Sequence, residues 1–139
     1  MVSKKVYIAT DGFVAFIDRA HEKHVQATAF FRYFSQEKYQ LYTNVVTMND
    51  AYMRMYNTIS PSLARDFLRV MSLSSVNIMY PETSDLKAAI KIVETSNSVD
   101  LTFAKALMAV MCNKKSVPQI MTYEYLHALF GLQMFYLPM

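Results

Sequence analysis

Residues 6–24 read VYIATDGFVAFIDRAHEKH and contain the pattern that decides the fold of this chain. The apolar run at 6–9 has the length of a buried strand, and Thr10 and Asp11 follow it directly. Apolar residues then recur with helical spacing over 13–17. A carboxylate at a strand-to-helix junction lies where α/β proteins often bind ligands, but aspartate is also a favoured helix N-cap. The sequence leaves both interpretations of Asp11 open.

The composition indicates one compact domain, and we expect it to cover residues 1–139. Hydrophobic residues make up 53% of the chain, with 2 Gly and 4 Pro, which excludes disordered and collagen-like chains. Cys112 is the single cysteine, so no internal disulfide is possible and a cytoplasmic location is expected. The net charge of +3 permits nucleic-acid binding without requiring it. Because no segment approaches roughly 18 apolar residues, we expect no membrane span.

Short apolar runs alternate along the chain with longer segments of helical spacing. This alternation predicts an α/β fold, a three-layer α/β/α sandwich around a central, mainly parallel sheet. Gly12 and Gly131 are the only glycines, so a glycine-rich phosphate loop is excluded, and with it the dinucleotide-binding and P-loop classes. The expected strands lie at 6–9, 40–43, 76–80, 119–122 and 134–137, and helical spacing is clearest at 24–34 and 47–58.

Three helix starts are predicted from their capping residues. Ser60 followed by Pro61 is typical of an N-cap and the first helical position. Thr83 or Ser84 is the expected cap of the next helix, and Asp100 of the helix at 101–111.

The helix expected at 101–111 is apolar on almost every side, so it should be largely buried. Lys105 is its only charged residue. An ammonium group in this setting must extend to water, lose its proton or meet a carboxylate, because burial of an unpaired charge is costly. The sequence leaves these outcomes open.

Four segments, taken in order, resemble the PIN domain and most closely the VapC-type toxins. They are HEKHVQATAFF (21–31), YTNVVTMNDAY (42–52), LTFAKALMAV (101–110) and IMTYEYLHALFG (120–131), followed by FYLP at 135–138. The resemblance covers nearly the whole chain. It implies an α/β/α sandwich in which clustered carboxylates hold Mg²⁺ or Mn²⁺ for RNA cleavage.

The family pattern has four acidic positions, and two of them are occupied by non-acidic residues in this chain. The first acid falls on Ala9, with Thr10 beside it and Asp11 two residues late, and the second matches Asp50. The third falls on Lys105. The fourth matches Glu124, in a Thr122-Tyr123-Glu124 pattern where Thr122 has a supporting role.

Two functions follow from this resemblance. The first is a PIN-like protein with a degenerate metal site, weak or inactive as a nuclease, that binds RNA, an antitoxin-like protein or its own copy as a homodimer. Here Lys105 occupies the cation's place and pairs with Asp50, Glu124 and Asp11. The second is an active Mg²⁺- or Mn²⁺-dependent endoribonuclease, the toxin of a toxin–antitoxin pair, using Asp11, Asp50 and Glu124, with Asp100 as a further candidate. A third hypothesis, that Ala9 is an engineered replacement of aspartate, would not explain Lys105.

Overall fold

The computed structural model describes residues 4–97, 101–123 and 133–134. Five strands form one sheet in the order β3-β2-β1-β4-β5, and each neighbouring pair is parallel. The strands are β1 (Lys5–Ile8), β2 (Gln40–Asn44), β3 (Asn77–Met79), β4 (Gln119–Met121) and β5 (Gln133–Met134). The predicted parallel sheet is therefore confirmed. The last strand was expected at 134–137, of which 135–137 lie outside the described residues.

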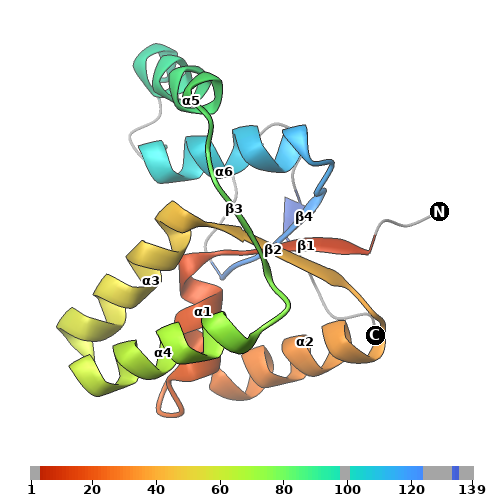
Figure 1. Cartoon of the computed structure of the whole chain (residues 1–139), viewed down its shortest axis with the longest axis vertical. Coiled ribbons are helices and arrows are strands. Elements are labelled where there is room, and N and C mark those ends of the chain that lie inside the picture. Colours follow the sequence, from red (N-terminus) through yellow and green to blue (C-terminus); the bar gives the residue numbers. More distant parts are fainter. Residues whose placement is uncertain (1–3, 98–100, 124–132, 135–139) are drawn as a thin grey trace.

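Helices cover both faces of the sheet (Figure 1). They are α1 (Thr10–Ile17), α2 (His24–Gln36), α3 (Val45–Thr58), α4 (Pro61–Leu73), α5 (Thr83–Thr95) and α6 (Phe103–Lys114). The helices α1 to α4 lie on one side, whereas α5 and α6 lie on the other (Figure 1). The three-layer α/β/α architecture predicted from the alternating pattern is thus confirmed.

The central strand β1 supplies side chains to a separate core on each face. Val6 and Ile8 pack among α1 to α4, whereas Tyr7 packs against α6, and all three are fully buried. This division follows from the alternation of side chains along a strand. It explains why residues 6–9 are uniformly apolar, since both faces of a covered parallel sheet are buried.

Gly12 allows α1 to approach the end of β4 closely. A Cβ atom at this position would lie 3.1 Å from the backbone carbonyl oxygen of Met121 and 3.3 Å from a methyl group of Ile8. Directly after β1, the Ala9 N–H donates a hydrogen bond to the same Met121 carbonyl at 3.2 Å. The close approach of α1 to the end of β4 brings together two of the segments that line the site described below.

The helix starts confirm one predicted cap and correct the others. Ser60 caps α4, since its hydroxyl oxygen accepts from the Leu63 N–H at 3.0 Å. The cap of α5 is Glu82, so the expectation of Thr83 or Ser84 was wrong. Its backbone N–H donates instead to the buried Asp85 carboxylate, at 2.9 Å.

The helix α6 begins later than the sequence pattern predicted. Its N-cap is Thr102, whose hydroxyl oxygen accepts from the Lys105 N–H at 3.2 Å, so Asp100 is not its cap. Asp100 itself lies outside the described residues. Within the described part of the chain, no helix is long and apolar enough to span a bilayer.

Candidate functional site

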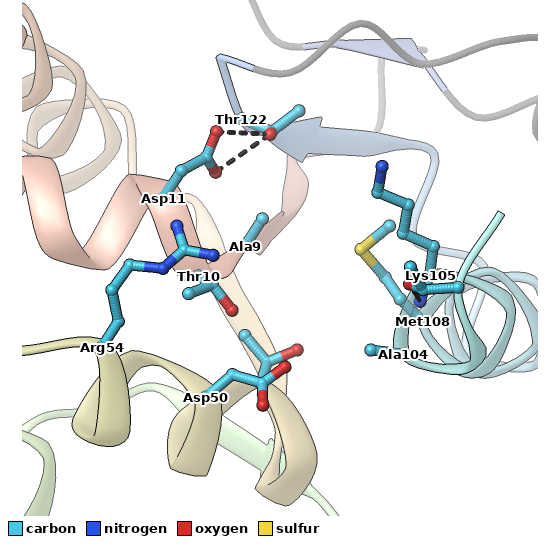
Figure 2. Close-up of a pocket in the computed structure, with 11 residues that line it drawn as sticks. Ala9, Thr10, Asp11, Asp50, Arg54, Ala104, Lys105, Met108 and Thr122 are labelled. Atoms are coloured by element: carbon cyan, nitrogen blue, oxygen red, sulfur yellow. Dashed lines mark hydrogen bonds between the residues drawn. The ribbon is translucent and has the colours of Figure 1, made fainter. Parts of the chain in front are cut away.

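A pocket of about 340 Å³ opens at the carboxyl ends of β1 and β4, between α1, α3 and α6 (Figure 2). This edge of a parallel sheet is the usual place for ligands in α/β folds. The residues lining the pocket are Ala9, Thr10, Asp11, Thr47, Asp50, Arg54, Thr102, Ala104, Lys105, Met108 and Thr122. Of the site residues singled out from the sequence, the structure brings together all except Asp100 and Glu124, which lie outside the described residues.

Asp11 connects the start of α1 to the end of β4. Its two carboxylate oxygens accept hydrogen bonds from the Thr122 hydroxyl at 2.9 and 2.8 Å, and one of them accepts from the Tyr123 N–H at 2.7 Å (Figure 2 shows the contacts with Thr122). The N-cap of α1 is Ala9, so the interpretation of Asp11 as a helix cap was wrong. The helix instead places Asp11 in its first turn, where its side chain reaches across to β4.

Tyr123 places its ring near an aromatic ring and a cation. Its ring stacks on Phe30 at a centroid distance of 6.3 Å, and the Lys23 ammonium lies 5.9 Å from the ring centroid. The phenol oxygen is buried and has no hydrogen-bond partner among the residues that the structure describes. Burial first, and the negative charge of Asp11 second, raise the pKa of Tyr123 to about 12. The phenol is therefore protonated and uncharged at neutral pH.

Asp50 and Arg54 lie one helical turn apart on α3 and both line the pocket. Ala51 and Met55 on the adjacent face of α3 are fully buried, which fixes the rotation of the helix. Both charged side chains are exposed to solvent. The sequence analysis did not identify Arg54, although its i,i+4 spacing from Asp50 placed it on the same face of the helix.

Lys105 enters the pocket from α6, on the side opposite to Asp50 and Arg54 (Figure 2). Thr102 fixes the first turn of α6, and the half-buried Lys105 lies in that turn. Among the described residues, Lys105 forms no ion pair with Asp11 or Asp50, so the predicted pairing with these two carboxylates was wrong. They come from α1 and α3, across the pocket from α6. The predicted pairing with Glu124 lies outside the described residues.

Ala9 presents only a methyl group where the resemblance places the first acid. Within residues 4–97 and 101–123, no cluster of three or more His, Cys, Asp or Glu side chains could hold a metal ion. The pocket offers the carboxylates of Asp11 and Asp50, and Asp11 already accepts from Thr122 and Tyr123. Magnesium prefers several oxygen ligands, whereas protonated nitrogens cannot coordinate it. The described donor set therefore does not fit a Mg²⁺ or Mn²⁺ site.

Comparison with known proteins places the fold but gives no sequence match. No family model matches the chain, and no curated protein does. Its architecture, a mainly parallel sheet covered by helices, is consistent with the PIN-like fold. The chain is similar in structure to VapC20 of Mycobacterium tuberculosis, a sarcin–ricin loop cleaving toxin, with a TM-score of 0.76. The match covers 86% of this chain and 89% of VapC20 at 12% identity, which confirms the predicted PIN-like, VapC-like fold.

Proposed function

We propose that this chain is a PIN-fold RNA-binding protein whose metal-dependent nuclease activity is weak or lost. The observation that carries the proposal is the composition of the pocket, in which Ala9 and Lys105 stand where the family resemblance expects carboxylates. The fold shared with a toxin that cleaves the sarcin–ricin loop supports RNA as the ligand class. The departure at Ala9 and Lys105 supports binding rather than cleavage.

The charges that line the pocket support this function on electrostatic grounds. Asp11 and Asp50 carry two negative charges, and Arg54 and Lys105 carry two positive charges, so these four groups have a formal sum of zero. Clustered carboxylates without such cations repel one another and need a divalent ion for neutralisation. Here Arg54 and Lys105 bring two positive charges to the same pocket and offset the carboxylate charge without a direct ion pair to Asp11 or Asp50. A bound cofactor is therefore not part of the proposed function.

A second candidate is the active endoribonuclease with Mg²⁺ or Mn²⁺ as cofactor. The observation that favours it is that Asp11 and Asp50, which come from different helices, line one pocket. Glu124 would have to complete this site, together with Asp11 and Asp50. Cleavage of RNA by the unmodified chain that depends on Mg²⁺ and is abolished by Asp50→Asn would establish this alternative and refute the first proposal.

The double change Ala9→Asp with Lys105→Asp tests whether these two residues are the reason for the proposed weak binding of Mg²⁺. It adds three units of negative charge to the pocket. A unit charge about 4 Å from a divalent ion interacts by about 8 kcal/mol at an effective dielectric constant near 20. If solvent leaves only about an eighth of this for each added unit, the total of about 3 kcal/mol corresponds to about 100-fold tighter Mg²⁺ binding. Isothermal titration calorimetry measures this affinity, and a labelled RNA reports any recovered cleavage.

A matched double variant controls for net charge and composition. Lys87 and Ala88 are exposed on α5 and do not line the pocket. Lys87→Asp with Ala88→Asp makes the same chemical changes away from the site, so it should leave Mg²⁺ affinity unchanged. Equal gains in the two double variants would show that overall charge, not the composition of the pocket, determines metal binding.

The resemblance also supports a protein partner and self-association. An antitoxin-like protein and a second copy of the chain are the partners we propose, in the cytoplasm. Val25 on α2, Leu73 on α4 and Tyr80, directly after β3, are strongly exposed apolar side chains that a partner would cover.

A further inference from the structure

Arg54 directs an unpaired guanidinium group into the pocket (Figure 2). Its side chain forms no hydrogen bond or ion pair with another described residue. By contrast, Arg69 on the neighbouring α4 is paired with Asp66 at 3.1 Å. Arg54 is therefore a charged donor in a concave site whose hydrogen-bonding capacity is open to a ligand.

The orientation of Arg54 follows from the packing of α3. The Asn44 side chain caps this helix by accepting from the Thr47 N–H at 2.8 Å, which fixes where the helix begins. Met55, next to Arg54 in sequence, is fully buried in the core beneath α3. Arg54 therefore faces the pocket because Met55, on the adjacent face of α3, is anchored in the core.

The chemistry of the guanidinium group selects an anion with paired oxygens. Its planar fork of N–H donors matches phosphate and carboxylate in a two-bond geometry. Thr10 lines the same pocket, and its hydroxyl makes no hydrogen bond to a described residue. A hydroxyl donor and a guanidinium group around one cavity suit the several acceptor oxygens of a phosphate.

The charge around the cavity further restricts the ligand. The four charged side chains that the described residues contribute to the pocket have a formal sum of zero, so they offer no net positive charge that would offset the larger cost of desolvating a dianion. A backbone phosphodiester carries one negative charge, whereas a terminal phosphate carries up to two at neutral pH. The pocket therefore favours an internal phosphate of the chain over its phosphorylated end.

We propose that Arg54 binds a backbone phosphodiester of single-stranded RNA in this pocket, without a bridging divalent ion. The inference rests on the proposed RNA-binding function and adds the residue and the chemical group through which binding occurs. Arg54 is then the pocket's main contact to the RNA backbone.

The test is RNA affinity measured by fluorescence anisotropy in the presence of EDTA. Arg54→Gln should weaken binding about 10-fold, and the slope of log affinity against log salt should fall by about one. Arg54→Lys keeps the charge but loses the fork, so its affinity should lie between those of Arg54→Gln and the unmodified chain. The matched control is Arg65→Gln, because Arg65 is exposed on α4 outside the pocket and its loss changes net charge equally. Thermal unfolding should be alike in all variants.

Two further measurements separate the inference from the function on which it rests. The same oligonucleotide with a 5′-phosphate or a 5′-hydroxyl should bind equally, and a 10-fold preference for the phosphorylated end would overturn the assignment to the backbone. If RNA binds but Arg54→Gln equals Arg65→Gln, the inference is wrong while the proposed function stands. Dimethyl phosphate is the probe used in the absence of RNA, and the readout is the Arg54 Nε–H NMR signal. If the chain fails to bind RNA, the proposed function is wrong. A shift of the Arg54 signal on addition of dimethyl phosphate would then still support a phosphate site at Arg54.

Discussion

Replacement of Asp11 should destabilise the protein, because this carboxylate joins two segments that are far apart in sequence. It accepts from the Thr122 hydroxyl at 2.8 and 2.9 Å and from the Tyr123 N–H at 2.7 Å. Hydrogen bonds to charged groups contribute about 1.5–3 kcal/mol each, but one hydroxyl proton serves both Thr122 contacts. Two donors are thus satisfied, so Asp11→Ala should lower the free energy of unfolding by about 3 kcal/mol.

The isosteric change Asp11→Asn should have a smaller effect. An amide oxygen can still accept from one donor, and the Thr122 hydroxyl can turn to accept from the new NH₂ group. The charge-assisted part of the interaction is lost, so we expect a loss of about 1–2 kcal/mol. Urea unfolding followed by circular dichroism measures both variants under two-state analysis.

Asp50→Asn is the matched control for Asp11→Asn. Asp50 lines the same pocket and loses the same charge, but it is exposed and its side chain has no described hydrogen-bond donor. Substitutions of this kind usually change stability by no more than about 0.5 kcal/mol. Equal stability of Asp11→Asn and Asp50→Asn would refute the argument that Asp11 joins α1 to β4.

Two other predictions concern alkaline stability and self-association. Burial raises the pKa of the Cys112 thiol from 9.0 to about 12 and also raises the pKa of Tyr7, whose phenol donates to or accepts from Thr47 at 2.6 Å. Unfolded chains lose these protons first, so stability should fall as pH rises above 9.0, by about 1.4 kcal/mol per unit from Cys112 alone, and Cys112→Ala should reduce this slope in pH-dependent urea unfolding. Sedimentation equilibrium should show a dimer at micromolar concentration, and a monomer across that range would contradict self-association.

The sheet and its helices were predictable because the chain separates two periodicities clearly. Residues 40–43 and 119–122 are short apolar runs, and the structure has β2 at Gln40–Asn44 and β4 at Gln119–Met121. Ser60-Pro61 marked the start of α4 through a local hydrogen bond. The caps of α5 and α6 were less predictable because several capping residues stand in succession, and the tertiary packing of α5 against α6 selects among them.

The sequence predicted which acidic residues lie at the site, but it did not predict which side chains form hydrogen bonds with each other there. The prediction correctly placed Asp11 and Asp50 near Lys105, because the carboxyl ends of parallel strands share one edge. It did not indicate that Asp11 would accept from Thr122, a contact between residues 111 positions apart. Arg54 was not predicted because the family pattern specifies only the acidic positions, and Arg54 is not one of them.

Ala9 and Lys105, the two departures from the acidic pattern, both make the formal charge of the pocket less negative. With aspartates at positions 9 and 105, Asp11, Asp50 and Arg54 would leave the pocket with a formal charge of about −3, which repels a phosphate unless a divalent cation bridges the two. With Ala9 and Lys105 the same five positions sum to zero. An RNA phosphate can then contact Arg54 directly, and a metal ion has less to neutralise. Either change alone would leave a net negative charge at these five positions, so the proposed phosphate contact without a bridging cation depends on both Ala9 and Lys105.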